Sequence, residues 1–276
     1  MSSPVAQYIP PEDDPIEKIT SLALEGKKAL ILGIANDQSI AFGCARAMRK
    51  MGAEIAMTYL NDKTKQYTQP LAEALDVPPE LYLPCDVRVE GQMAGVFEAI
   101  RQQWGILDIA LHSIAFAPRD DLHGRVVDCS RQGFLTAMDV SCYSFLEMAH
   151  LAEPLMTNGG TLFTMTFYGA ERVVEHYNVM GPVKAALQAT AMYLAAELGP
   201  KGIRIHPISP GPIKTRAASG IGGFDELMDT AAERAPERAL STIEDVGVAT
   251  AFLATDYAKM ITGDVMYIDG GYHILG

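Results

Sequence analysis

The sequence lacks several features that would assign it to other classes of protein. It has no block of consecutive Lys and Arg residues, and 22 basic against 34 acidic side chains give a formal net charge of −12. Nucleic acid and anionic membrane surfaces are therefore poor partners. It also lacks an apolar run of the length that spans a membrane, and residues 1–20 have no basic start or apolar stretch of a signal peptide. These absences predict a cytoplasmic protein.

Paired cysteines and clustered histidines are also missing. The four cysteines show no C-x-x-C spacing, and no second histidine lies at metal-ligand spacing from His112. Four reduced thiols and no metal site are therefore predicted. His112 lies in an apolar run, where a hydrogen-bonded core histidine is the expected role.

What is present is typical of one globular domain with a sizeable core, since 49% of the 276 residues are apolar and 20% are charged. Residues 1–22 are rich in Pro and acidic residues and are expected to form an arm on the surface of a domain that covers residues 23–276. From Lys27 onward, short apolar runs alternate with segments of helical period, which predicts βαβ units. The predicted fold is α/β, doubly wound, with a seven-stranded parallel sheet. The expected strands are 29–32, 54–59, 81–85, 107–112, 161–166, 203–208 and 265–268, and the expected helices are 40–51, 63–75, 91–103, 131–152, 183–198 and 243–254.

The loop after the first strand has the position of a dinucleotide-binding turn, although it is not a G-x-G-x-x-G. It begins at Gly33, and Ser39 takes the place of the middle glycine just before Ile40. Ser39 is expected to cap the helix and to offer its hydroxyl and amide to a phosphate. The alternative is an ordinary turn with a capping serine.

Three further strand ends place small or polar residues at the same edge of the sheet, and together they outline a cofactor trench. Asp86 is a candidate acceptor for an adenine amino group, or alternatively a turn residue before the next helix. The small residues after His112 let the backbone approach a ribose or nicotinamide, or alternatively only pack tightly. These strand ends are Cys85-Asp86-Val87, Ser113-Ile114-Ala115 and residues 208–212.

The end of the second strand bears on the choice of cofactor. No Arg follows it, and Asp62 favours a free 2′-hydroxyl, whereas Lys63 and Lys65 are candidates for a 2′-phosphate. NADH is therefore predicted over NADPH.

Tyr177 and Lys184 are the predicted catalytic pair. Seven residues of helix bring two side chains back to one face, and Pro182 suits a first helical turn. A Lys ammonium near the phenol favours tyrosinate and can hold ribose hydroxyls, while Tyr offers a proton to a developing oxyanion. The alternative is a chance helical repeat. The small, polar stretch 215–223 is expected either to form a lid over the substrate, within a segment at about 213–240, or to be a plain connection.

These residues together resemble the enoyl-acyl-carrier-protein reductases of the bacterial fatty-acid pathway, a divergent branch of the short-chain dehydrogenases. The likeness runs from about residue 26 to residue 271. It implies a Rossmann domain assembled as a homotetramer, and NADH-dependent reduction of a trans-2-enoyl thioester on acyl carrier protein or coenzyme A. Hydride would go to the β-carbon, with the enolate oxygen held by Tyr177. The resemblance rests on the Tyr177-to-Lys184 spacing, the Gly33 loop and residues 112–118 and 209–221.

The resemblance also implies roles for individual residues. Leu60 takes the place where NADH-using relatives usually have Gln. The predicted substrate contacts are Ala117, Phe167, Tyr168 and Tyr177. The predicted cofactor contacts are Gly33, Ser39, Ile40, Leu60, Asp86, Val87, Ser113, Ile114, Ala115, Lys184, Ile213, Lys214, Thr215, Arg216 and Ala217.

The sequence departs from the family at two places. Phe167 stands where relatives have a second active-site tyrosine, so either Tyr177 works alone or the loop bends to present Tyr168. Asp225 and Glu226 stand where many relatives have basic residues, which weakens docking of an acidic carrier and leaves a coenzyme A ester open. A short-chain carbonyl reductase or alcohol dehydrogenase, or a silent NAD-binding regulatory protein, remain the alternative functions.

Overall fold

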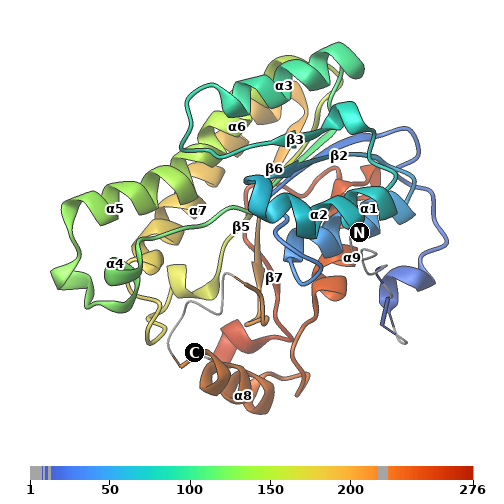
Figure 1. Cartoon of the computed structure of the whole chain (residues 1–276). Coiled ribbons are helices and arrows are strands. Elements are labelled where there is room, and N and C mark those ends of the chain that lie inside the picture. The colour runs from blue at the N-terminus through green and yellow to red at the C-terminus, as the bar shows by residue number, and fades with distance from the viewer. Residues whose placement is uncertain (1–7, 9, 12–13, 217–222, 276) are drawn as a thin grey trace, which may run out of the picture.

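The computed structural model describes residues 8, 10–11, 14–216 and 223–275, and within them a parallel sheet of seven strands lies between two layers of helices (Figure 1). The strand order is β3-β2-β1-β4-β5-β6-β7, and every neighbouring pair is parallel. The predicted fold class is confirmed. The strands are β1 (Lys28–Leu32), β2 (Glu54–Tyr59), β3 (Tyr82–Pro84), β4 (Ile109–His112), β5 (Gly160–Met165), β6 (Ile203–Pro210) and β7 (Met266–Ile268).

The helices alternate with the strands as the βαβ pattern requires. Seven of them correspond to the six expected helical segments, since 131–152 contains both α5 and α6, and α4 and α8 are additional. The helices are α1 (Ile40–Lys50), α2 (Asp62–Ala74), α3 (Gln92–Gln103), α4 (Arg119–His123), α5 (Arg131–Met138), α6 (Ser144–Ala152), α7 (Met180–Leu198), α8 (Phe224–Arg234) and α9 (Ile243–Ala254). In the described part of the chain, none of them combines the length and apolar character needed to cross a membrane.

The core has two halves, one on each face of the sheet. Successive residues of β1 point to opposite sides, so Leu30 packs with α3, α6 and α7, while Ile31 packs with α1, α2 and α9. Both residues are fully buried. A strand buried on both faces is the reason that its sequence is continuously apolar rather than alternating.

The expected helix 131–152 is interrupted in the middle. Asp139–Tyr143 forms a π-helical turn between α5 and α6. The hydroxyl of Ser144 donates to the carbonyl oxygen of Val140 at 2.7 Å, which is a side-chain competitor for the helix's own hydrogen bonds. The same hydroxyl lies 2.7 Å from Nε2 of His112, whose Nδ1 lies 3.1 Å from Oγ1 of Thr164. The prediction of a hydrogen-bonded core histidine is confirmed.

The N-terminal arm is bound more firmly than its composition predicts. Asp14 and Ile16 are both buried, and the Asp14 carboxylate is paired with Arg46 of α1. Arg46 also lies 3.3 Å from Glu244 of α9 and stacks over the Tyr8 ring, with 4.8 Å to the centroid. This ion-pair network joins the described part of the arm to the two helices behind the first loop.

Candidate active site

A cavity of about 570 Å³ follows the carboxyl ends of the strands on both sides of β1. β1 is the point at which the strand order changes direction, because β2 lies on one side of it and β4 on the other. Doubly wound sheets bind dinucleotides at such a point. Twelve predicted cofactor contacts line this cavity: Gly33, Ser39, Ile40, Leu60, Asp86, Val87, Ser113, Ile114, Ala115, Lys184, Thr215 and Arg216.

The first loop is closed by Ser39 in a way that the sequence did not predict. The amides of Ala35 and Asn36 donate to the Ser39 hydroxyl at 3.0 and 3.1 Å, and this side chain makes no hydrogen bond to the amides of α1. The expected side-chain cap is therefore wrong, because the loop itself uses the hydroxyl oxygen. Within the described residues, no hydrogen bond involves the backbone N–H groups of Ile40 and Ala41. These two donors and the helix dipole fit the pyrophosphate of a dinucleotide.

A glycine is required at position 33 because the ends of β1 and β4 approach each other closely there. Its φ is +103°, and a Cβ atom there would lie 2.1 Å from the carbonyl oxygen of Ser113. No other residue fits this approach of the β1 and β4 ends without displacing them. The glycine thus shapes the floor of the cavity.

Asp86 and Arg88 both line this cavity, and their side chains are paired. Its carboxylate accepts from Nε and Nη2 of Arg88 at 2.9 and 2.7 Å, and these hydrogen bonds lower the pKa of Asp86. The carboxylate also accepts from the backbone amide of Arg88 at 3.0 Å, so the turn role is confirmed. Oδ1 thus accepts two hydrogen bonds and Oδ2 accepts one, so Oδ2 keeps a lone pair with which an adenine amino group is compatible.

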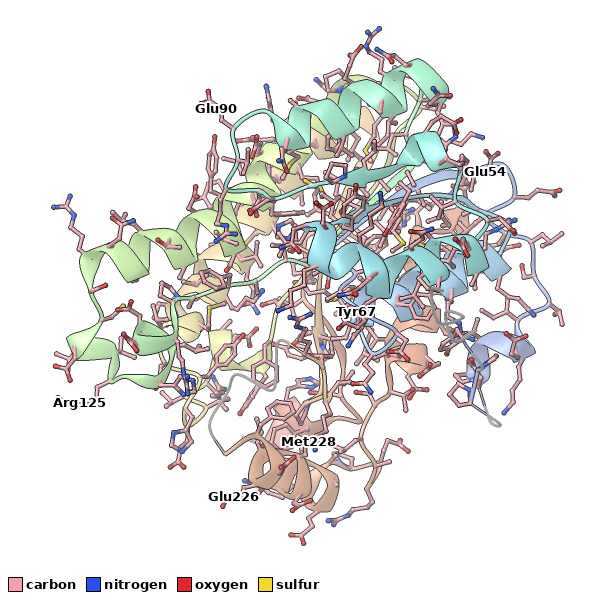
Figure 2. All side chains as sticks on the ribbon, viewed as in Figure 1. Glu54, Tyr67, Glu90, Arg125, Glu226 and Met228 are labelled. Carbon is pink, nitrogen blue, oxygen red and sulfur yellow. The ribbon has the colours of Figure 1, made fainter. Side chains whose placement is uncertain are left out.

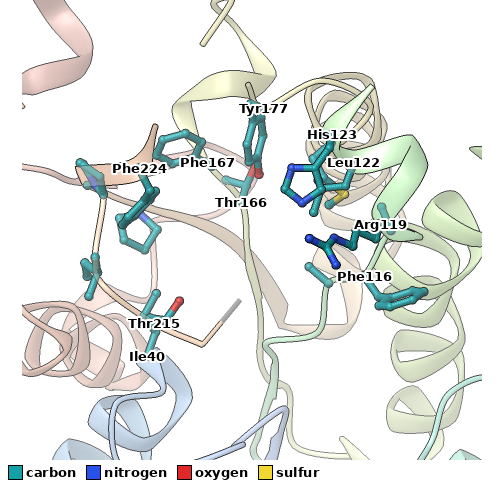
Figure 3. A pocket seen from close by; sticks show the side chains of 17 residues that line it. Ile40, Phe116, Arg119, Leu122, His123, Thr166, Phe167, Tyr177, Thr215 and Phe224 are labelled. Atoms are coloured by element: carbon teal, nitrogen blue, oxygen red, sulfur yellow. The ribbon is translucent and has the colours of Figure 1, made fainter. Parts of the chain in front are cut away.

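A second cavity, of about 620 Å³, adjoins the first and shares four lining residues with it: Ile40, Ala115, Phe116 and Thr215. Most of its lining is apolar. Tyr177 enters it from the loop before α7, and its hydroxyl points toward the middle of the cavity (Figure 3). No hydrogen bond joins this hydroxyl to another of the described residues. The two cavities place a phenolic donor next to a cofactor-sized trench.

The backbone around Tyr177 holds its ring in place. His176 and Asn178 have φ values of 64° and 46°, a left-handed conformation on both sides of the tyrosine. The Asn178 side chain donates to the carbonyl oxygen of Leu122 in α4 at 2.7 Å. A Cβ atom at Gly169 would lie 2.5 Å from Cδ1 of Tyr177, so only glycine leaves room for the ring.

Phe167 and Tyr168 have different surroundings. The Phe167 ring lines the second cavity, which is the candidate substrate cavity, and meets the Tyr177 ring edge-on, with centroids 5.0 Å apart. Tyr168 is buried in a separate cluster and packs against Tyr272 at 5.8 Å. It is absent from the described lining, so the loop does not bend to present it. Tyr177 is the tyrosine that lines the described part of the cavity.

Lys184 lies in α7, seven residues after Tyr177, and lines the cofactor cavity, although the stretch between the two residues is helical only from Met180 onward. Its ammonium group donates to the carbonyl oxygen of Met165 at 2.6 Å, and burial lowers the pKa of Lys184 to about 8. Burial also raises the pKa of Tyr177 above its usual value. The expectation that the lysine charge favours tyrosinate is therefore not met, because desolvation dominates at the phenol. The raised pKa favours the protonated phenol.

Two of the predicted cofactor contacts do not line the first cavity, and a third falls outside the described part of the chain. Ile213 lines the substrate cavity instead, and Lys214 pairs with Asp225 at 3.1 Å, which neutralises one of the acidic residues of α8. Ala217 lies outside the described residues, as do residues 218–222 of the expected lid. The residues that sequence reasoning missed are Arg119 and His123 of α4, which line the substrate cavity. Two basic residues four apart, just after a strand end that contributes to the site, are the signal that was available.

Among the four cysteines, Cys85 lines the cofactor cavity. Cys44, Cys85, Cys129 and Cys142 are free thiols. No cluster of three or more metal-ligating side chains occurs among the residues that the structure describes.

The fold and this site define a dinucleotide-dependent oxidoreductase with a Tyr–Lys pair, and comparison with known proteins narrows the class. The model of the enoyl-(acyl carrier protein) reductase family matches residues 33–273. The chain is 45% identical over 256 residues to the NADH enoyl-acyl-carrier-protein reductase FabI of Nostoc sp., covering 92% of this chain and 99% of that one. It is 44% identical over 253 residues to the FabI of Bacillus cereus, with 92% and 99% coverage.

Solved structures agree with this result. An enoyl-acyl-carrier-protein reductase of Anaplasma phagocytophilum in complex with NAD superposes with a TM-score of 0.89 at 46% identity, covering 93% of this chain and 97% of the other. The chain belongs to the enoyl-(acyl carrier protein) reductase family. Of the three functions that the sequence left open, membership favours the enoyl reductase.

Proposed function

We propose that this protein reduces the trans-2 double bond of an enoyl thioester with NADH in fatty-acid biosynthesis, and that Tyr177 holds the oxygen of the resulting enolate. The observation that carries the proposal is the position of the Tyr177 hydroxyl, which faces an apolar cavity that shares four lining residues with the cofactor trench. An apolar cavity with one phenolic donor suits an acyl chain whose only polar group is its thioester.

NADH would be held by residues already positioned along the trench. The free amides at the start of α1 face the pyrophosphate, and Asp86 lies where the adenine would be. Lys184, whose ammonium is fixed on the carbonyl of Met165, has two further N–H donors for ribose hydroxyls. When bound, the cofactor supplies the hydride that reaches the β-carbon of the substrate.

Tyr177 acts in this reaction as a hydrogen-bond donor. Its hydroxyl donates a hydrogen bond to the thioester oxygen, and the bond strengthens as negative charge develops there. Because burial raises its pKa, the phenol keeps its proton at physiological pH. The Phe167 ring, which replaces a second hydroxyl, excludes water from one side of the tyrosine.

The partners and the assembly are part of the proposal. The thioester is carried by acyl carrier protein or coenzyme A, and the protein acts in the cytoplasm as a homotetramer. Exposed apolar side chains on α5–α7 support self-association, because patches of this kind mark protein interfaces. They are Leu135, Tyr143, Leu146, Met192 and Tyr193.

The experiment that tests the function follows NADH absorbance at 340 nm with trans-2-enoyl coenzyme A esters of short and long chain, and then repeats it with NADPH. Oxidation of NADH that depends on the enoyl ester is expected. Turnover of ketones or alcohols without any enoyl activity would overturn the proposal, and so would binding of NADH without turnover of any thioester, including those on acyl carrier protein.

A further inference from the structure

The substrate cavity has two basic side chains that the reaction at Tyr177 does not use. Arg119 and His123 lie four residues apart on α4, and both point into the cavity from the same side (Figure 3). Among the described lining residues they are the only basic ones, and none is acidic. A cationic edge in an otherwise apolar cavity requires an explanation.

Neighbouring cations are neutralised, whereas Arg119 is not. Arg88 pairs with Asp86, Lys214 pairs with Asp225, and Arg125 lies 3.6 Å from Asp128. Within the residues that the structure describes, neither Arg119 nor His123 forms an ion pair. In a protein with a formal net charge of −12, an unpaired arginine that faces a cavity attracts anions to that place.

Hydrogen bonds hold the short helix α4 in position, and this fixes where Arg119 and His123 enter the cavity. Within α4, Asp121 accepts hydrogen bonds from the backbone amide and hydroxyl of Ser130, at 2.6 and 3.2 Å. The Asn178 side chain binds the carbonyl oxygen of Leu122 at 2.7 Å. The second contact ties α4 directly to the loop that carries Tyr177.

Burial separates the cavity into a mouth and an interior. Arg119 and His123 are exposed, whereas Tyr177 and Thr166 are buried. On the side of α4, the carrier arm of a thioester whose carbonyl reaches Tyr177 would pass Arg119 and His123. In both acyl carrier protein and coenzyme A this arm is pantetheine, and its far end bears a phosphate. The phosphate of the arm would then lie at the mouth of the cavity, near Arg119 and His123, while the thioester lies in the interior, near Tyr177.

We infer that Arg119, assisted by His123, binds the phosphate of the phosphopantetheine arm of the substrate and so determines preference for phosphorylated thioesters. The inference rests on the proposed function. Arginine suits the task because its planar guanidinium can donate two parallel hydrogen bonds to phosphate oxygens. The contact lies far from the reacting carbon, so it serves substrate affinity and not the chemical step.

The test compares one enoyl group on four carriers: unphosphorylated pantetheine, 4′-phosphopantetheine, coenzyme A and acyl carrier protein. NADH is saturating, and the variant is Arg119→Gln. Arg119→Lys restores the charge, and Arg125→Gln is the matched control, because Arg125 lies at the outer edge of the molecule and does not line the cavity (Figure 2). Calorimetry with saturated butyryl thioesters of the first three carriers measures affinity without turnover. Thermal unfolding checks that each variant is folded.

In Arg119→Gln we expect KM to rise about three- to tenfold for the three phosphorylated carriers, as one partly exposed charged contact allows. The kcat should not change, and KM for the pantetheine thioester should stay the same. Butyryl affinity should fall by the same factor for phosphopantetheine and coenzyme A only, and Arg119→Lys should recover most of it. Raising the salt concentration should weaken phosphopantetheine binding in the unchanged protein and not in Arg119→Gln.

Three results would overturn the inference. A loss restricted to coenzyme A would assign the contact to its nucleotide phosphates, and a loss restricted to acyl carrier protein would assign it to the acidic carrier surface. An equal loss for all four carriers, pantetheine included, would indicate a structural role. Failure of the unchanged protein to reduce any of the four thioesters would instead refute the proposed function, so the two failures are distinguishable.

Discussion

Replacing Gly169 with alanine tests whether the position of the Tyr177 ring limits turnover. The new Cβ would lie 2.5 Å from Cδ1 and 3.0 Å from Cε1 of Tyr177. Carbon atoms in contact lie about 3.5–4.0 Å apart, so the ring must move by about 1 Å. The backbone itself accepts alanine, because Gly169 is not among the residues with positive φ. The effect therefore comes mainly from the tyrosine side chain, with a smaller contribution from the Phe167 ring, whose Cδ1 would lie 3.3 Å from the new Cβ.

A misplacement of this size lowers the rate by about 10²-fold when the displaced group acts in the transition state. Overpacking also costs about 1–3 kcal/mol of stability. We expect kcat for an enoyl thioester to fall by about that factor while the dissociation constant for NADH, followed by fluorescence titration, stays the same, because Gly169 does not line the cofactor cavity. The matched control is Gly95→Ala in α3, whose Cβ would meet nothing within 4 Å. Full activity in a folded Gly169→Ala variant would refute the reasoning.

Two further predictions concern Lys184 and the arm. Burial lowers the pKa of Lys184 to about 8, so its ammonium form is lost as the pH rises through that value. The dissociation constant for NADH should therefore increase when the pH exceeds about 8. The Lys184→Arg variant should not show this pH dependence. An affinity that is flat from pH 6 to pH 10 in the unchanged protein would contradict the role of the ammonium. Asp14→Ala breaks a buried ion pair but leaves Arg46 its contact with Glu244, so urea denaturation should show a loss of about 3 kcal/mol. Glu17→Ala, which removes a half-exposed partner 3.6 Å from the same arginine, should cost less than about 1 kcal/mol, and equal losses would contradict the argument.

Periodicity predicted the sheet well because the central strands are buried on both faces. The expected 54–59 agrees with β2 at both ends, and 243–254 agrees with α9, whose capping box of Thr242 and Asp245 marks its start. The predicted helix 131–152 could not show its π-helical turn, since that turn depends on where the Ser144 hydroxyl finds an acceptor. The hydrophobic periodicity of the segment does not show whether the Ser144 hydroxyl competes with the helix backbone for an acceptor.

Within the site, the sequence predicted several of the residues that take part but not the groups to which their side chains bind. The position of Ser39 before α1 was predicted, but its hydroxyl accepts hydrogen bonds from loop amides and not from the helix. This difference depends on the loop conformation, which the sequence does not show. Arg119 and His123 were missed because a five-residue helix with only one apolar residue has the pattern of an exposed surface. Burial of Asp14 was missed because its partner Arg46 lies 32 residues away in the chain.

The measurement that tests the central claim most directly is the turnover number of Tyr177→Phe with an enoyl thioester and NADH. Removing one oxyanion donor costs about 2.7–4 kcal/mol, so kcat should fall by about 10²–10³-fold. The dissociation constant for NADH should stay the same, because Tyr177 is absent from the described lining of the cofactor cavity. A variant that binds NADH and reduces the thioester at the unchanged rate would show that Tyr177 does not hold the enolate oxygen.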